Sequence, residues 1–516
     1  MSRSVRLLVL ILSFVVMAVC LPCPDGFGQS SPELRTPKPG PAPHINGPKI
    51  YGARPGHPFL YRIPCTGTRP MHFSAKGLPA SLKLDVTSGI ISGNAPANPG
   101  EFTLTLKAEN SEGKTSRPFK IVVGNTLGLT PQMGWNDWYT FYGHPSDSVI
   151  RSSADAMIAS GMADYGYQFV DIDDAWARKP GSSDALLGGP TRDSEGNILP
   201  NGRFPSMPSL TEYIHSLGLK AGIYSGPGPL TCAKFEASYQ HEDSDARQFS
   251  KWGFDLLKYD WCSYRSIAKS NDLAELQLPY KKMSSLLEKQ DRDIVLNMCQ
   301  YGMGEVWKWG REVGGMSWRT TGDLGMVKGT SLPGFYSVGF ANAALGDYAG
   351  PGGWNDPDYI LIGTVGDANN IKRPAKPTSL TPAEQYSYMS MWSLMASPLF
   401  FSGDMTKLDP FTLNILCNSE VIDIDQDTLG KQAKIVRKID QEFVLAKPLE
   451  DGSIAVGLFN LSEEPRTISI NYSDVGKSGR QKVHDVWRQK DIGTFADSFK
   501  AEVPAHDVVL VRVSQR

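Results

Sequence analysis

The sequence of 516 residues has no excess of charge of one sign. It carries 52 lysines and arginines against 54 aspartates and glutamates, which gives a formal net charge of −2. A protein that binds nucleic acid or an anionic membrane surface by electrostatics needs a basic excess, so we expect neither partner. The hydrophobic fraction of 41% and the charged fraction of 21% are ordinary for a globular protein and argue against an intrinsically disordered chain.

Histidine and cysteine are also scarce. The eight histidines form no HExxH or HxH pattern, so a zinc site is not expected. The GxGxxG, P-loop and GxSxG patterns are absent, which argues against a nucleotide site and against a Ser-His-Asp hydrolase. Of the seven cysteines, Cys20 and Cys23 lie beside the N-terminal apolar run. The other five allow one or two disulfides but not a disulfide scaffold.

No hydrophobic run is long enough to span a bilayer. The run Leu7–Val19 follows Arg3 and Arg6, and its length favours a signal peptide over the alternative, an N-terminal membrane anchor. We therefore predict a cleaved signal peptide at residues 1–28 and a secreted or periplasmic protein without membrane insertion. Residues 29–45 are rich in proline and are expected to form an extended linker.

Three regions with different periodicity follow the linker. Residues 46–125 alternate apolar and polar positions between turn signals, which predicts a small antiparallel β-sandwich. Its segment Gly77–Asn110 resembles the immunoglobulin-like modules of many exported bacterial proteins. Residues 127–430 repeat short apolar strands and helices, which indicates a parallel sheet and favours a (β/α)₈ TIM barrel over a doubly wound sheet. Residues 431–516 return to a period of two and predict a C-terminal antiparallel β-domain. The expected fold class is therefore multidomain.

Acidic residues follow several predicted strands of the central region. Asp173 and Asp174 follow one strand, Asp260 ends another, and Asp323 lies just beyond a third. One such acid alone could be a helix cap or a turn residue, but caps do not explain paired acids together with Lys258 at successive strand ends. Catalysis in a (β/α) barrel takes place at the carboxyl ends of the strands. A pocket of carboxylates with few histidines suggests glycoside hydrolysis, and an Mg²⁺ or Ca²⁺ site is the main alternative.

Seven motifs follow one another along the chain and permit a family comparison. They are Met133–Asn136, Val170–Trp176, Gly222–Tyr224, Leu257–Cys262, Ser317–Asp323, Gly352–Asp358 and Ala396–Phe400. Together they resemble glycoside hydrolase family 27, the α-galactosidase and α-N-acetylgalactosaminidase family, over about residues 127–516. The resemblance implies a (β/α)₈ barrel followed by an antiparallel β-sandwich, and a retaining mechanism with no cofactor and no metal.

The resemblance also implies a role for each candidate residue. Asp260 matches the nucleophile and Asp323 the general acid/base of a retaining enzyme. Asp173 and Asp174 match the pair that accepts hydrogen bonds from the 4- and 6-hydroxyls of the sugar. The remaining implied roles are Lys258 and Arg319 as donors to other ring hydroxyls, Trp135 as the aromatic floor of the site, Gln300 in the loop that reads the 2-position, and Cys232 and Cys262 as a disulfide beside the nucleophile.

Five positions depart from the usual residues of this family and bear on the substrate rather than on the reaction. The expected partner is a carbohydrate, an α-galactoside. The alternatives are a β-L-arabinopyranosidase, an α-N-acetylgalactosaminidase or an isomaltodextranase on the same fold, or a carbohydrate-binding protein without catalysis. The sequence does not indicate an oligomeric state. The departures are Ala175 for Cys, Gly226 for Asp, Gln300-Tyr301 for Glu-Trp, and Tyr359 for Met.

Overall fold

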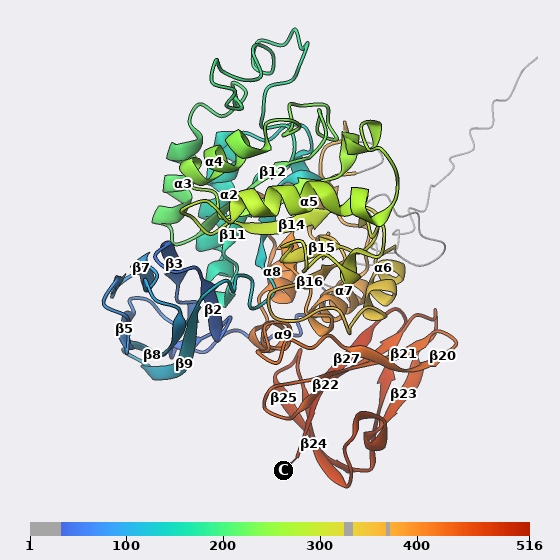
Figure 1. The fold of residues 1–516 in the computed structure, drawn as a ribbon. Coiled ribbons are helices and arrows are strands. Elements are labelled where there is room, and N and C mark those ends of the chain that lie inside the picture. The colour runs from blue at the N-terminus through green and yellow to red at the C-terminus, as the bar shows by residue number, and fades with distance from the viewer. Residues whose placement is uncertain (1–31, 325–333, 368–371, 516) are drawn as a thin grey trace, which may run out of the picture. The chain divides into compact units, whose positions relative to one another are not determined.

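The computed structural model describes residues 32–324, 334–367 and 372–515, so the predicted signal peptide lies outside the described residues. All elements below belong to the unit Leu34–Arg516. Within these ranges, no helix combines the length and the apolar character that a membrane crossing requires. The fold class predicted from the sequence is confirmed, with an Ig-like module, a parallel barrel and a C-terminal antiparallel β-sandwich (Figure 1).

The segment before the Ig-like module is irregular, as expected for a proline-rich linker, but it is bound to the rest of the unit. The backbone N–H of Thr36 donates to Oδ1 of Asn414 at 3.0 Å, and its hydroxyl donates to the Asn414 carbonyl at 2.6 Å. The predicted linker also ends in a strand rather than in coil, because β1 (His44–Ile45) pairs with β4 (Cys65–Thr66).

The Ig-like module consists of two sheets around a small apolar core. Phe73, Leu106 and Ile121 are buried between the sheets. The module is not wholly antiparallel as the alternation suggested, because β2 pairs with β9 in parallel. The larger sheet has the order β2 (Ile50–Ala53), β9 (Gly113–Val123), β8 (Gly100–Asn110), β5 (His72–Lys76), and the smaller has β3 (Pro58–Arg62), β7 (Ile90–Asn94), β6 (Leu82–Leu84).

The central region is a barrel of eight parallel strands. Seven parallel pairings link the eight strands in a row, and an isolated parallel bridge between Ile360 and Phe401 closes the row into a ring. Chain-order neighbours around a closed sheet exclude the doubly wound alternative. The strands are β10 (Met133–Asn136), β11 (Phe169–Asp171), β12 (Lys220–Ser225), β13 (Leu256–Asp260), β14 (Val295–Cys299), β15 (Ser317–Arg319), β16 (Trp354–Asp356) and β19 (Leu399–Phe401).

Helices cover the outside of the barrel strands (Figure 1). Several begin at a side-chain cap, such as Ser206, Asp272 and Thr381, whose oxygens accept a backbone N–H of the first turn. The helices are α1 (Trp138–Phe141), α2 (Asp147–Ala159), α3 (Met207–Ser216), α4 (Glu242–Trp252), α5 (Leu273–Leu287), α6 (Gly334–Ala343), α7 (Pro382–Leu394), α8 (Pro410–Leu416) and α9 (Ser419–Asp425), with a short hairpin of β17 (Thr364–Val365) and β18 (Lys376–Pro377).

The sequence also predicts a helix over Tyr280–Lys289, ahead of the strand that begins at Ile294, and the start of that helix is wrong. Helix α5 begins at Leu273, behind the Asp272 cap, and includes Pro279 in its second turn. Proline inside a helix removes one backbone hydrogen bond, and here the buried face that includes Leu276 and Tyr280 packs in the core and stabilises the helix.

The C-terminal region is an antiparallel sandwich. Val456, Ile468 and Val511 are among the side chains buried between its two sheets. One sheet has the order β20 (Lys434–Ile439), β21 (Glu442–Pro448), β22 (Ile454–Asn460), β27 (Val508–Ser514), β24 (Arg480–Asp485), β25 (Lys490–Ala496), and the other pairs β23 (Arg466–Asn471) with β26 (Ser498–Val503).

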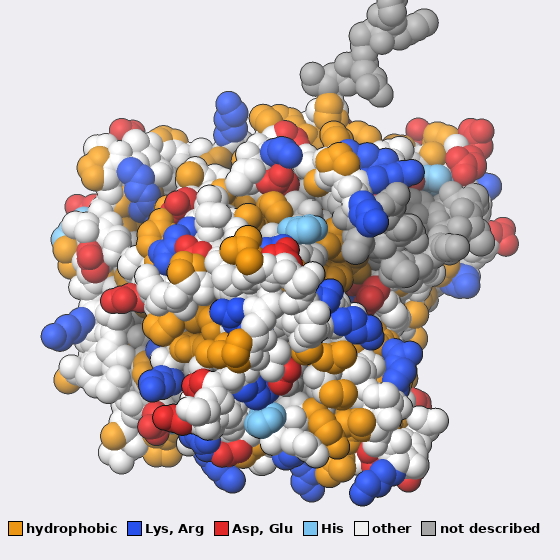
Figure 2. Space-filling view, turned by 90° about the horizontal axis from the view of Figure 1, so that it is seen from above, with side chains coloured by type: hydrophobic (Ala, Val, Ile, Leu, Met, Phe, Trp, Pro, Cys, Tyr) orange, Lys and Arg blue, Asp and Glu red, His pale blue; other side chains and the backbone are white. Residues whose placement is uncertain are grey.

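Figure 2 shows the molecule from above. Lysines, arginines and acids are interspersed over this face, in keeping with the near-zero net charge.

Candidate active site

A cavity opens at the carboxyl ends of the barrel strands, where the sequence predicts the site. It contains about 360 Å³ of empty space, its open mouth included. Five of its side chains are carboxylates and two are cations, so polar groups from strands far apart in the sequence meet there. The lining residues are Trp138, Tyr139, Asp173, Asp174, Tyr224, Cys232, Lys258, Asp260, Arg319, Asp323, Asp358 and Tyr359.

Asp260 is the last residue of β13 and is buried, with 5% of its surface exposed. Its Oδ1 accepts a hydrogen bond from the Tyr301 hydroxyl at 2.6 Å and one from the Cys262 N–H at 3.4 Å. Burial raises the pKa of Asp260, while Lys258 and the Tyr301 hydrogen bond oppose that rise. One carboxylate oxygen is therefore held in place, and the described residues give the other oxygen, Oδ2, no hydrogen bond.

Asp323 lies beyond the end of β15 and differs from Asp260 in its access to water. Its side chain is 40% exposed, and Nη2 of Arg319 lies 3.3 Å from its Oδ1. The same guanidinium nitrogen lies 3.1 Å from Oδ2 of buried Asp358, which also accepts from the Tyr139 hydroxyl at 3.1 Å. The cavity therefore combines a buried carboxylate with a carboxylate that can exchange protons with solvent.

Asp173 accepts hydrogen bonds from three side chains on one oxygen. Its Oδ2 accepts from Lys258 Nζ at 2.8 Å, Asn136 Nδ2 at 2.9 Å and the Tyr359 hydroxyl at 3.2 Å. Lys258 is buried, so this carboxylate compensates its charge. The structure thus places the predicted cation, which comes from β13, against the acid that follows β11.

Asp174 is held by backbone instead of by a cation. Its Oδ1 accepts from the N–H of Ala175 at 2.6 Å, and its Oδ2 accepts from the N–H of Ala233 at 2.7 Å. Burial raises the pKa of Asp174 to about 7, although the Thr231 and backbone hydrogen bonds counteract it. This acid is therefore harder to ionise than an aspartate in water.

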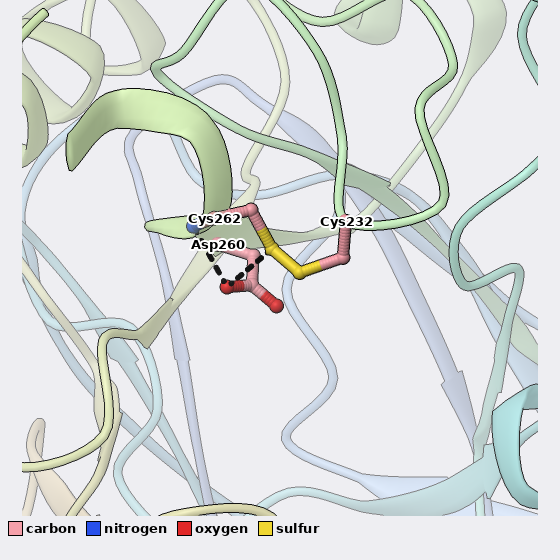
Figure 3. A group of neighbouring side chains, drawn as sticks. All are labelled: Cys232, Asp260 and Cys262. Carbon is pink, nitrogen blue, oxygen red and sulfur yellow. Dashed lines mark hydrogen bonds between the residues drawn. A yellow bond between two sulfur atoms is a disulfide. The ribbon is translucent and has the colours of Figure 1, made fainter. Parts of the chain in front are cut away.

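The disulfide between Cys232 and Cys262 that the resemblance implies is present beside Asp260. Figure 3 shows it running from the loop of Cys232 to the end of β13, where Sγ of Cys262 lies 3.3 Å from Oδ1 of Asp260. These three residues are also the one group within the described ranges with atoms close enough to hold a metal. Since both cysteines are in the disulfide, the group provides a single carboxylate and not a ligand set.

Two residues predicted to bind the substrate lie outside the cavity lining. Trp135 is fully buried and its indole N–H donates to the Gly403 carbonyl at 2.8 Å, while Trp138 and Tyr139 line the cavity. Gln300 is 1% exposed, and neither atom of its amide has a hydrogen-bond partner among the described residues.

From the sequence, Tyr301 is noted only as a departure from the family and is given no role, but its hydroxyl contacts Asp260. Its place directly after Cys299 and Gln300, at a strand end, is the signal that could have identified it.

Paired carboxylates at the mouth of a (β/α) barrel, with a buried cation beside them, define a class of enzyme, the glycoside hydrolases. A family model described as "Alpha galactosidase A" matches residues 130–427, and one described as "Alpha galactosidase C-terminal beta sandwich domain" matches residues 443–513. An Ig domain model matches residues 42–124. The chain belongs to the α-galactosidase family, glycoside hydrolase family 27, and is a glycoside hydrolase.

Relatives cover most of the chain. An α-galactosidase of Cyamopsis tetragonoloba is 36% identical over 392 residues, which are 75% of this chain and 87% of the relative. A Bacteroides fragilis structure, named as a candidate α-galactosidase/melibiase, is 35% identical with a TM-score of 0.85 and covers 93% of this chain and 100% of that chain. α-Galactosidase I of Mortierella vinacea is 28% identical with a TM-score of 0.67, over 76% of this chain and 98% of that chain.

Proposed function

We propose that the protein is a retaining α-galactosidase that removes terminal α-D-galactosyl residues from oligo- or polysaccharides by double displacement. The observation that carries the proposal is the pairing of buried Asp260, which has one oxygen free of hydrogen bonds from the described residues, with water-accessible Asp323 in one cavity. Relatives named α-galactosidases that span most of this chain support the sugar.

In the first step, Oδ2 of Asp260 forms a bond to the anomeric carbon of the galactosyl residue. The bond between that carbon and the glycosidic oxygen breaks, and Asp323 donates its proton to the departing oxygen. In the second step, a water molecule gives its proton to Asp323 and bonds to the anomeric carbon as the bond from that carbon to Oδ2 of Asp260 breaks. Each displacement inverts the anomeric centre, so the product retains the α configuration. Exposure of Asp323 to solvent suits a group that exchanges its proton in every turnover.

Substrate binding follows from the remaining charged groups of the cavity. Asp173 and Asp174 accept hydrogen bonds from the 4- and 6-hydroxyls, and Lys258 and Arg319 donate to other ring hydroxyls. Trp138, which lines the cavity, provides the apolar surface that the sequence assigned to Trp135. An ionised acceptor that a wrong sugar leaves unpaired costs about 1–3 kcal/mol, which disfavours glucosides at the 4-position.

The signal peptide and the domain division complete the proposal. Export with cleavage of residues 1–28 delivers the enzyme to the periplasm or the medium, where a polymeric substrate is accessible. Mass spectrometry of the protein recovered from the periplasm and medium tests the cleavage. The proposed domains are 46–125, 127–430 and 431–516.

The experiment is a screen of 4-nitrophenyl glycosides with the wild type and the variants Asp260→Ala and Asp323→Ala. α-Galactoside should be the best substrate, and loss of acid/base catalysis alone should cost about 10²–10⁴ in rate. Asp347→Ala is the matched control, because Asp347 is exposed and pairs with Lys434 away from the cavity. Wild-type turnover in Asp260→Ala, or release of the β-anomer first in an NMR time course, would contradict the proposal.

A further inference from the structure

Tyr301 occupies an unusual backbone position at the floor of the site. It follows the end of β14 and has a φ of 64°, in the left-handed region that non-glycine residues seldom adopt. Such strain persists only where the surrounding structure holds the residue, and it is concentrated at functional sites. This conformation accompanies a hydrogen bond from the Tyr301 hydroxyl to Oδ1 of Asp260 at 2.6 Å. That distance is typical of a hydroxyl donating to a carboxylate that bears a charge.

The hydroxyl is fixed from its other side by the disulfide. Sγ of Cys262 lies 3.7 Å from the Tyr301 oxygen, and Sγ of Cys232 lies 3.8 Å from it. Burial and the Asp260 charge raise the pKa of Tyr301 well above its usual value. The phenol therefore keeps its proton throughout the pH range of the enzyme and acts as a donor to Asp260.

We propose that Tyr301 is a positioning residue of the double displacement. Its hydroxyl holds Oδ1 of Asp260 and so leaves Oδ2 as the attacking atom. The same hydroxyl stabilises the carboxylate that departs when the glycosyl–enzyme bond breaks. The proposal rests on the function proposed above and gives Tyr301 an orienting role in the first step and a stabilising role in the second.

The two steps use this hydrogen bond differently. When Oδ2 bonds to the anomeric carbon, the charge of Asp260 is lost and Oδ1 becomes an ester carbonyl, a weaker acceptor. When water attacks, the electron pair of the bond between the anomeric carbon and Oδ2 returns to the carboxylate, and the hydrogen bond from Tyr301 strengthens. Hydrolysis of the intermediate gains from the donor, whereas formation of the intermediate gains only in orientation.

Removal of the hydroxyl should therefore slow the second step selectively. With 2,4-dinitrophenyl α-galactoside, whose leaving group needs little protonation, the glycosyl–enzyme should accumulate in Tyr301→Phe. kcat and KM should fall together by about tenfold to a hundredfold, and kcat/KM should change much less. The first turnover should appear as a burst of dinitrophenolate.

The acid limb of kcat/KM gives a second readout. Asp260 has to be ionised to attack, and its pKa falls when a donor binds the charged form. Without the Tyr301 donor, the pKa of Asp260 rises and the acid limb moves to higher pH. The titratable and charged groups that face Asp260 from the surrounding elements are Lys258, Tyr301, Asp323, Asp173, Tyr224, Tyr280 and Cys299.

The test compares Tyr301→Phe with Tyr142→Phe. Tyr142 is the matched control, because its buried hydroxyl has no hydrogen-bond partner among the described residues and it does not line the cavity. A burst, a lowered KM and a shifted acid limb in Tyr301→Phe alone support the proposal. A fall in kcat/KM with KM and the acid limb unchanged and no burst overturns it. If the phenylalanine variant is poorly expressed, Tyr301→Leu should give the same readouts.

The outcome can be separated from failure of the proposed function. If the wild type hydrolyses no α-galactoside, the proposed function fails. The pKa of Asp260 can still be compared by ¹³C NMR of aspartate-labelled wild type and Tyr301→Phe, with Asp260→Asn for assignment. A higher pKa in the variant supports the hydrogen bond, and equal values overturn the inference.

Discussion

Replacement of Lys258 by methionine removes one of the two buried cations of the cavity and keeps most of the side-chain volume. Lys258 Nζ lies 2.8 Å from Oδ2 of Asp173, and the two side chains are 10% and 2% exposed. At an effective dielectric constant of about 20, the attraction at this distance is about 6 kcal/mol before desolvation is counted. Because desolvation opposes it, removal of one partner of a buried pair costs about 3–5 kcal/mol in unfolding free energy.

Two consequences can be measured. Guanidinium unfolding followed by tryptophan fluorescence should show that loss of about 3–5 kcal/mol in Lys258→Met, reduced where Asn136 and Tyr359 still donate to Asp173. The acid limb of kcat/KM should also move to higher pH, since Lys258 is the largest influence that lowers the pKa of Asp260.

The double variant Lys258→Met/Asp173→Asn is the control, because it leaves no uncompensated charge and should recover part of the stability. The reasoning is refuted if Lys258→Met loses less than about 0.5 kcal/mol, the range of an ordinary surface change, and its acid limb is unmoved.

Three further predictions concern the same cavity. Burial raises the folded-state pKa of Asp174 to about 7, so Asp174 lowers the stability of the wild type as the pH rises from about 4 to 7, where the carboxyl ionises only in the unfolded chain. In thermal melts between pH 4 and 8, the stability of Asp174→Asn relative to wild type should therefore increase by about 2–4 kcal/mol, and a difference that stays constant with pH would contradict this. Reduction of the Cys232–Cys262 disulfide should lower the thermal stability and the activity of the wild type, and the double serine variant should not respond to the reductant. If wild type and variant lose activity equally with reductant, the disulfide is not the cause of the loss. The family resemblance assigns Gln300 to the 2-position, although its side chain lies outside the cavity lining, and on that assignment kcat/KM for the α-galactoside should exceed that for the N-acetylgalactosaminide by at least about tenfold. Equal values would show that Gln300 does not limit the 2-position.

The sequence alone was sufficient to predict the barrel and its acids. Alternation of strands and helices can be recognised locally in the sequence. Repeated strand–helix units form a closed parallel sheet, and the carboxyl ends of its strands all lie on one face of the barrel. Asp173, Asp174, Asp260 and Arg319 therefore met in one cavity, although more than a hundred residues separate Asp173 from Arg319. The missed start of α5 shows the limit of local rules, because packing of its buried face outweighs the cost of Pro279.

Only the tertiary structure decided which side chains at the strand ends face the cavity. Trp135 turns away to bind the Gly403 carbonyl, and Tyr301 instead of its neighbour Gln300 reaches Asp260. Neighbouring residues at a strand end point in different directions, and the left-handed backbone of Tyr301 breaks the regular alternation. The pKa of Asp174 is likewise a property of the fold, because burial, which raises it, depends on segments distant in the sequence that exclude water from this carboxylate.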